Sequence, residues 1–304
     1  GRAGYDFVDA TLPQLRQMAE SYLKSGVTTL YPTLATAPMD ALCAASDRIR
    51  AAGIPQFAGI HLEARFLCPA YRGAHDEALL AVPDADELRI LLSHLGPGPH
   101  ITAALEMDAD GTFTQTALAA GATLSLGHTG ATYEQARAAF DNGATALTHT
   151  FNAMPPLHHR AGGPICAAFE MPVYTEFICD GIHIRPEMIK LAYAAKEYSH
   201  FVLVTDSLGA TGMPDGNYCV GSLPVIVKGR RAETPDGHLA GSTLSLWEAV
   251  NNLARFCDIP IEQALYHATL APARELGLEG RAGEIRVGAP AAFLIADLCD
   301  GQIV

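Results

Sequence analysis

The sequence predicts an α/β protein, a parallel (β/α) barrel that carries a small accessory β unit. Short apolar runs alternate with amphipathic stretches between residues 27 and 205, which is typical of buried parallel strands separated by helices. Four of these runs are followed by a side chain that can bind a metal ion or move a proton, namely Glu63, His128, His149 and Asp206. Ligands bind at the carboxyl ends of parallel strands, so these four side chains are expected to meet around one point.

Seven apolar runs, each five to eight residues long, are expected to form the barrel strands. In chain order they are Val27–Leu34, Gln56–Leu62, His100–Leu105, Ala122–Leu126, Ala144–Thr148, Tyr174–Cys179 and Phe201–Thr205. A closed barrel of this type has eight strands. We therefore expect that the first strand is missing and that roughly 50 further residues precede Gly1. The alternative is a barrel that is complete with seven strands.

Amphipathic stretches between these runs are expected to form helices. Their apolar residues recur at three- and four-residue spacing, as in Leu15, Met18 and Tyr22. The stretches are Leu12–Ser25, Met39–Ala52, Ala85–Leu95, Phe113–Ala120, Thr132–Asn142 and Pro186–Glu197. Four of them end at a glycine, the usual residue just past a helix, which lies before the next strand: Gly26, Gly53, Gly121 and Gly143.

After Asp206 the pattern changes to short alternating runs separated by turns, which favours an antiparallel accessory unit. We expect strands at Tyr218–Val220, Val225–Val227 and Arg231–Ala232, helices at Leu244–Phe256 and Ile261–Leu276, and strands at Ala292–Ala296 and Gln302–Val304. The chain then divides into a barrel with the catalytic site (1–215), a hairpin insert (216–240), C-terminal barrel helices (241–280) and C-terminal strands of the accessory unit (281–304).

Composition limits the class of protein. The 304 residues are 49% hydrophobic and 17% charged, which fits a large globular core. The net charge of −13 argues against a nucleic-acid surface, which needs clustered Lys and Arg. No apolar stretch reaches the ~20 residues of a membrane span. The seven Cys residues show no CxxC pair, so we expect reduced thiols and a cytoplasmic location.

The four polar residues at the strand ends suit metal-dependent hydrolysis. Taken singly, each has an ordinary structural role, because a His is often a hydrogen-bonded core residue and an Asp often caps a helix. Together they favour a site, since imidazoles and carboxylates bind Zn²⁺ or Fe²⁺. One carboxylate then remains free for proton transfer.

Several motifs resemble those of the N-acetylglucosamine-6-phosphate deacetylases of the amidohydrolase superfamily. The resemblance runs from Gly4 to about Pro290, in matching order and spacing. The motifs are His61-Leu-Glu, Gly127-His-Thr, Thr148-His-Thr-Phe-Asn-Ala-Met, Asp180-Gly-Ile-His, Val204-Thr-Asp and Leu239-Ala-Gly-Ser-Thr. The resemblance implies a metal-dependent-hydrolase barrel of the TIM type that here lacks its first strand.

The resemblance also implies a role for each matching residue. Glu63, His128 and His149 become the metal ligands, with Zn²⁺ the first choice and Fe²⁺ the alternative. Asp206 becomes the general acid and base, and His75 polarises the acetyl carbonyl. The residues expected to bind substrate are Ala74, Asn152, Ala153, Arg160, His183, Leu239, Ala240 and Gly241. The family has Gly-Pro after the metal-binding Glu, whereas this chain has Ala64-Arg65, so we expect Arg65 to crowd or repel the cation.

The resulting hypothesis is an enzyme of amino-sugar catabolism that removes acetate from N-acetylglucosamine 6-phosphate and gives glucosamine 6-phosphate. The resemblance also implies a homodimer with Arg160 near the interface. Three alternatives stay open: N-acetylgalactosamine 6-phosphate as substrate, a cyclic-amide hydrolase or deaminase of the superfamily, and a non-catalytic sugar-phosphate-binding protein. A small molecule is the expected partner, with neither nucleic acid nor membrane.

Overall fold

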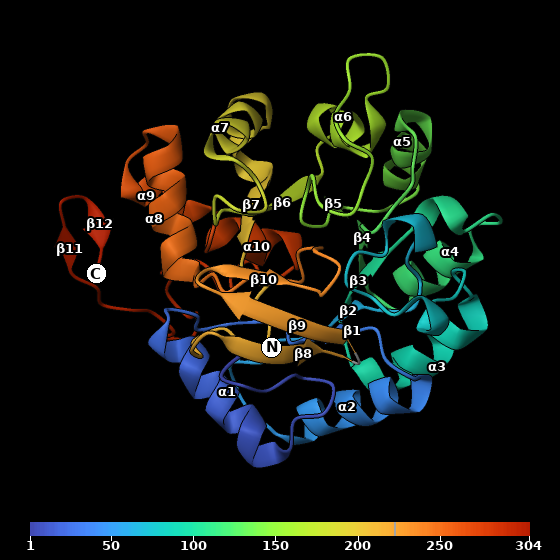
Figure 1. Ribbon diagram of the computed structural model, residues 1–304, viewed down its shortest axis with the longest axis horizontal. Helices are drawn as coiled ribbons and strands as arrows, with labels where there is room; N and C mark the ends of the chain where they lie inside the picture. The colour runs from blue at the N-terminus through green and yellow to red at the C-terminus, as the bar shows by residue number, and fades with distance from the viewer. Residues whose placement is uncertain (222) are drawn as a thin grey trace.

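Seven parallel strands form one sheet in sequential order in the computed structural model, which describes residues 1–221 and 223–304. The strands are β1 (Thr33–Ala35), β2 (His61–Glu63), β3 (His100–Ala103), β4 (Thr123–Leu126), β5 (Ala146–Leu147), β6 (Tyr174–Ile178) and β7 (Phe201–Val204). All seven lie within or beside the predicted runs. In Figure 1 the helices α1 to α9 surround this sheet, and α10 lies nearer its centre.

The helices agree with the predicted stretches to within two residues at most ends. They are α1 (Leu12–Lys24), α2 (Met39–Ala51), α3 (Ala85–Leu95), α4 (Thr112–Ala119), α5 (Tyr133–Asp141), α6 (Gly163–Glu170), α7 (Pro186–Ala195), α8 (Leu246–Cys257), α9 (Ile261–Tyr266) and α10 (Leu270–Glu275). Helix α1 buries Leu15, Met18 and Tyr22 against the core, as its spacing predicts. Large side chains of this kind each contribute about 1.5–3 kcal/mol when buried.

The helices differ from the predictions in two places. The stretch Ile261–Leu276 forms two helices instead of one, because Pro272 has no N–H to continue the hydrogen-bond ladder and Thr269 takes a non-helical conformation. Helix α6 was not predicted. It is only eight residues long and begins with Gly163 and Pro164, residues that usually indicate a turn.

The sheet is open between its first and last strands. Among the described residues, β1 is hydrogen-bonded to β2 and β7 to β6, with no pairing of β1 to β7. Both edges of the sheet are therefore unpaired among the described residues, as a barrel that lacks one strand requires, and a seven-stranded barrel closed on itself is excluded for the described chain. A cavity of about 1070 Å³ extends from the carboxyl ends of the strands towards Tyr22 and Val27.

The accessory part has two small antiparallel sheets. One contains β8 (Gly216–Val220), β9 (Leu223–Lys228) and β10 (Arg231–Glu233), close to the predicted strands. The other pairs β11 (Leu298–Cys299) with β12 (Gln302–Ile303). The predicted strand Ala292–Ala296 is wrong. Its apolar side chains, such as Phe293 and Ile295, are exposed, and no strand in the described part of the chain pairs with it.

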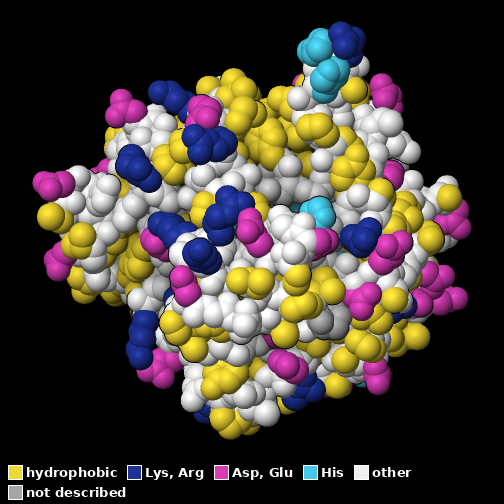
Figure 2. All heavy atoms as spheres, in the orientation of Figure 1, with side chains coloured by type: hydrophobic (Ala, Val, Ile, Leu, Met, Phe, Trp, Pro, Cys, Tyr) yellow, Lys and Arg dark blue, Asp and Glu magenta, His cyan; other side chains and the backbone are white. Residues whose placement is uncertain are grey.

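The loop before α6 stands out from the edge of the molecule (Figure 1). His158, His159 and Arg160 are exposed on this loop, and Figure 2 shows His and basic side chains projecting together from that edge. None of the described helices is long and apolar enough to cross a membrane.

Candidate metal centre and active site

The strand ends place the four predicted residues at one side of the sheet. Glu63 is the last residue of β2, and His128, His149 and Asp206 each lie two residues beyond β4, β5 and β7. His128, His149 and Asp206 have φ angles of 48°, 29° and 48°. This left-handed conformation costs of order 1–3 kcal/mol in a non-glycine residue and concentrates at functional sites.

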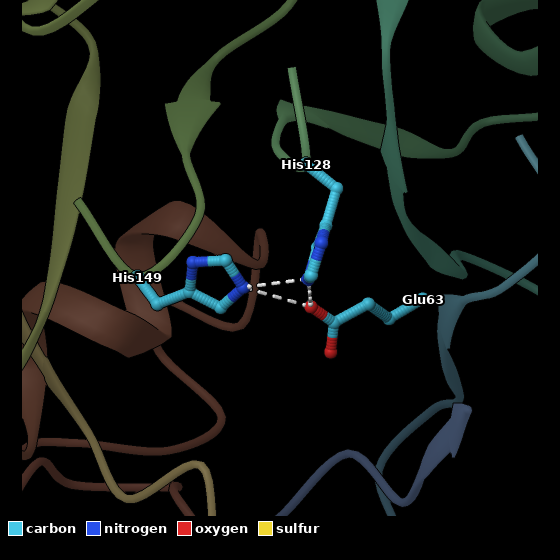
Figure 3. Close-up of side chains that lie close together, drawn as sticks. All are labelled: Glu63, His128 and His149. Carbon is cyan, nitrogen blue, oxygen red and sulfur yellow. Dashed lines mark hydrogen bonds and ion pairs between the residues drawn. The ribbon is translucent and has the colours of Figure 1, made fainter. Parts of the chain in front are cut away.

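Glu63, His128 and His149 converge on one point (Figure 3). The Oε1 atom of Glu63 lies 2.9 Å from His149 Nε2 and 3.1 Å from His128 Nε2. The two Nε2 atoms are 3.2 Å apart. All three residues are buried. Two imidazole nitrogens and a carboxylate oxygen form a donor set that fits a divalent metal ion and leaves room for water as a further ligand.

Hydrogen bonds and charges favour cation binding by Glu63, His128 and His149. The ring of His128 donates from Nδ1 to the Tyr71 carbonyl at 2.8 Å, which leaves the Nε2 lone pair facing the centre. Burial tends to raise the pKa of Glu63, but the neighbouring His128 and His149 hold it well below its usual value. Burial tends to lower the pKa of His149, whereas the Glu63 carboxylate raises it to about 9. A proton and a metal ion therefore compete for the same place.

Asp206 faces the same cavity from the end of β7. Burial, followed by the negative charge of Glu63, raises the pKa of the Asp206 carboxyl group, as suits a group that takes up and releases a proton. Its backbone carbonyl accepts the Ser242 N–H at 2.7 Å. Gly241 has a φ of 63°, and a Cβ there would lie 3.0 Å from the Asp206 carbonyl oxygen, so this close approach requires glycine.

His75 and His183 face the cavity with fixed rings. His75 Nδ1 is hydrogen-bonded to the Thr36 hydroxyl at 2.7 Å, and its ring lies 4.6 Å from that of His128. Burial and the neighbouring His128 lower the pKa of His75 to about 3, so the imidazole is neutral at physiological pH. His183 Nδ1 lies 2.7 Å from Asp180 Oδ2.

The cavity brings together most of the residues predicted to bind substrate. Besides the three candidate ligands and Asp206, its lining includes Ala74, His75, Asn152, Ala153, His183, Leu239 and Gly241. Two predicted residues are not part of the lining. Ala240 is buried in the core of the accessory sheet, and Arg160 is exposed on the loop before α6. Within one chain, Arg160 therefore does not reach this site.

Arg65 does not crowd the metal centre, so that expectation is wrong. Its guanidinium group forms paired hydrogen bonds with Glu87, from Nε to Oε2 at 3.0 Å and from Nη2 to Oε1 at 3.0 Å. A further bond joins Nη1 to the Leu79 carbonyl at 3.3 Å. These contacts lie on the α3 side of the loop, so the positive charge is neutralised away from Glu63.

Residues outside the predicted site hold it in place. Asp180 accepts the backbone N–H groups of Ile182 and His183 at 2.8 Å each, a turn that the Asp-Gly spacing could have indicated. Glu106 accepts the Thr129 hydroxyl at 2.7 Å and the Gly130 N–H at 2.6 Å. This contact joins two loops, and no local pattern predicts it.

The chain is similar in sequence to deacetylases that act on amino-sugar phosphates. An N-acetylglucosamine-6-phosphate deacetylase from Vibrio furnissii is 34% identical over 311 residues, covering 97% of this chain and 75% of the relative. An N-acetylgalactosamine-6-phosphate deacetylase from Escherichia coli O157:H7 is also 34% identical over 311 residues, with 98% and 80% covered.

Solved structures agree with the sequence comparison. The N-acetylglucosamine-6-phosphate deacetylase of Thermotoga maritima has a TM-score of 0.89 at 30% identity, covering all of this chain and 85% of that one. A mutant of the Mycobacterium smegmatis enzyme, in complex with N-acetyl-D-glucosamine-6-phosphate, has a TM-score of 0.88 at 31% identity, covering 100% and 83%. The sequence model of the amidohydrolase family matches residues 14–303. The chain belongs to the amidohydrolase family.

Proposed function

We propose that this chain is a metal-dependent deacetylase that hydrolyses the acetamide of N-acetylglucosamine 6-phosphate to glucosamine 6-phosphate and acetate. The observation that carries the proposal is the convergence of Glu63, His128 and His149 beside Asp206 in one cavity. The relatives at 34% identity with this activity support it. Retention of Asp206 argues against a protein that only binds sugar phosphates, because binding alone needs no carboxylate placed for proton transfer.

Glu63, His128 and His149 would hold the metal ion. When bound, the ion supplies Lewis acidity that makes water nucleophilic at neutral pH. Asp206 takes a proton from the attacking water and returns it to the leaving amine. Nδ1 of neutral His75 is hydrogen-bonded to the Thr36 hydroxyl. In the tautomer that accepts this bond, the His75 Nε2–H is available to the acetyl carbonyl oxygen.

Asn152, Ala153 and His183 are proposed to contact the sugar phosphate. They line the cavity beside the metal centre. Arg160 is proposed to reach the phosphate bound in a second copy of the chain, because it does not line its own cavity. The proposed assembly is therefore a homodimer in which each copy contributes to the other's site.

Zn²⁺ is the proposed metal, with Fe²⁺ as the alternative, since both accept nitrogen and oxygen donors. All seven cysteines are free thiols. Free thiols agree with the cytoplasmic location that we propose from the spacing of the cysteines.

N-Acetylgalactosamine 6-phosphate is the second candidate substrate. The Escherichia coli O157:H7 deacetylase named for that sugar is as similar to this chain as the Vibrio furnissii enzyme, at 34% identity. The two sugars differ at one hydroxyl group, and both offer the same acetamide and phosphate to the site.

Acetate release by the Zn²⁺-loaded protein tests the function. We expect turnover of N-acetylglucosamine 6-phosphate, much slower turnover of unphosphorylated N-acetylglucosamine, and loss of turnover after chelation. Faster turnover of the galactose isomer would establish the second candidate. Binding of either sugar phosphate without acetate release, by a protein that holds its metal, would overturn the catalytic proposal.

A further inference from the structure

A second group of possible metal ligands lies inside the sheet, outside the active-site ligand set. It consists of His100 at the start of β3, Glu176 within β6 and Glu275 at the end of α10. One ligand atom from each lies within 4.8 Å of the others. The three residues are 3%, 8% and 4% exposed. The three side chains are therefore shielded from bulk solvent, although they line the cavity.

Two atoms of this cluster are buried without a hydrogen-bond partner. His100 uses Nδ1 for a bond with the Thr123 hydroxyl at 2.8 Å. Its Nε2 atom has no hydrogen bond and lies 3.7 Å from Glu176 Oε1. Glu275 Oε1 also has none. Buried polar atoms are nearly always paired, so two unpaired atoms on adjoining side chains indicate a missing partner.

A neighbouring histidine shows how such a ring is satisfied without a ligand. The ring of His61 lies 4.9 Å from that of His100. Both of its nitrogens are engaged, Nδ1 with the Thr33 hydroxyl at 3.1 Å and Nε2 with the Thr102 hydroxyl at 2.8 Å. His100 differs because its second nitrogen faces carboxylates instead of a hydroxyl group.

Charge also favours a cation at this place. The carboxyl groups of Glu176 and Glu275 contact each other, and burial together with the charge of Glu176 raises the pKa of Glu275 well above its usual value. Two buried carboxylates side by side are costly unless a positive charge lies between them.

We infer that His100, Glu176 and Glu275 bind a second divalent metal ion, separate from the catalytic centre, with a structural role. One imidazole nitrogen and two carboxylate oxygens suit Zn²⁺, Mn²⁺ or Fe²⁺. Ligand atoms about 2.0–2.2 Å from one tetrahedral ion lie about 3.3–3.6 Å apart. The atoms of this cluster lie within 4.8 Å of one another, so the cluster would contract when the ion binds. All three residues line the cavity that also contains the catalytic centre, which gives an ion a path to the site.

This ion would tie α10 to the sheet and support the catalytic centre. Glu275 is on α10, which packs against β7, whereas His100 and Glu176 are on β3 and β6. Glu176 also accepts the backbone N–H of the candidate ligand His149, at 3.2 Å from its Oε2. The Glu176 carboxylate therefore belongs to the second metal site and also orients His149 of the catalytic centre.

Metal content tests the inference directly. The protein is stripped with a chelator, reloaded with Zn²⁺ and desalted, and the bound zinc per chain is measured by mass spectrometry. We expect two ions in the unaltered chain and one in Glu275→Gln, which keeps the shape of the side chain but loses its charge. Glu63→Gln is expected to lose the other ion. Glu279→Gln is the matched control, because that exposed carboxylate pairs with Arg274 at 3.0 Å outside the cluster, and it should retain two.

Thermal unfolding gives a second readout. Added Zn²⁺ should raise the unfolding temperature (Tm) of Glu275→Gln by less than that of Glu279→Gln, because Glu275→Gln has lost one binding site. One zinc ion in the unaltered chain would overturn the inference, and the two carboxyl groups would then share a proton. Two ions in a folded Glu275→Gln would also overturn it. If Glu275→Gln does not fold, His100→Gln is measured in its place with the same expected loss of one ion.

Discussion

Three histidine rings that face the cavity are each held by a bond on the nitrogen that faces away, whereas Nδ1 of His149 has no hydrogen-bond partner. His128 is fixed by the Tyr71 carbonyl, His75 by the Thr36 hydroxyl and His183 by Asp180. Each bond sets which nitrogen is free for a metal ion or a substrate. The chemistry of the site therefore depends on residues that never touch the substrate.

Replacement of Asp206 separates proton transfer from metal binding. We expect Asp206→Asn to lower kcat by about 10²–10⁴-fold, because the amide cannot take a proton from water. Zinc content should stay unchanged, since the three candidate ligands remain. Acetate release and metal analysis on the same preparation check this. Turnover within a few-fold of the unaltered enzyme would exclude Asp206 as the acid and base.

His267 makes the folded chain sensitive to acid. This ring is fully buried, and its Nδ1 lies 2.8 Å from the Phe201 carbonyl. Burial lowers the pKa of His267 to about 4, from an ordinary value of 6.5. Between these values the unfolded chain holds a proton that the folded chain lacks. The free energy of unfolding therefore falls as pH decreases, by about 1.4 kcal/mol for each pH unit.

The variant His267→Gln lacks this titration. It should be less stable than the unaltered chain at pH 7, and the difference should shrink as pH falls from 6.5 towards 4. Urea unfolding of both proteins at pH 7, 6 and 5 measures the difference, in which other titrating groups largely cancel. A difference that stays constant over this range would contradict the prediction.

Loops after the strands carry the site, and contacts between these loops fix their shape. The loop after β4 is held by Glu106, which lies in the short helix η3 (Leu105–Met107) and binds Thr129 and Gly130 just beyond His128. Since His128 itself has a left-handed backbone, the loop needs such support to keep the ring in place.

Loss of Glu106 should loosen the metal centre. We expect Glu106→Ala to weaken Zn²⁺ binding or activity by about 10–100-fold, the usual effect of removing a group that orients a ligand. Competition with a chromogenic chelator measures the affinity. Asp110→Ala is the control, because Asp110 bonds to Thr112 on the exposed surface. Equal zinc affinity in both variants would show that Glu106 does not position His128.

The described part of the chain is built around an open seven-stranded sheet, and one loop protrudes from it. The active site lies at the carboxyl ends of the strands. Arg160 is on the loop before α6, and this loop stands out from the molecule in Figure 1. Since Arg160 does not line its own cavity, its role in phosphate binding depends on a second copy of the chain.

Assembly and phosphate binding should therefore change together. We expect a dimer in sedimentation experiments at micromolar concentration. Arg160→Ala should raise KM for the phosphorylated substrate about tenfold or more, because a hydrogen bond to a charged group contributes about 1.5–3 kcal/mol. Arg137→Ala, on the exposed face of α5, serves as control. A monomer whose KM is unaffected by Arg160→Ala would contradict both the dimer and the role of Arg160 in phosphate binding.

The sequence by itself determined the order of strands and helices and the position of the four polar residues at the strand ends. These features are local. An apolar run such as Phe201–Thr205 indicates a strand, and a glycine such as Gly143 indicates the end of a helix, from neighbouring residues alone. Parallel strands align their carboxyl ends, so the convergence of Glu63, His128 and His149 followed from the pattern. The periodicity did not reveal the eight-residue helix α6, nor the break before Pro272, where the proline itself is the local signal of a helix end.

Only the tertiary structure decided how the site is held and which predicted residues reach it. Arg65 is drawn away by Glu87, and Arg160 stands outside the cavity. The cluster of His100, Glu176 and Glu275 joins three distant segments. Such contacts depend on the relative positions of segments up to 175 residues apart (residue 100 to residue 275), and no spacing within one segment contains that information. Long-range packing determines these contacts, because each side chain bonds to a partner that only the folded chain brings close to it.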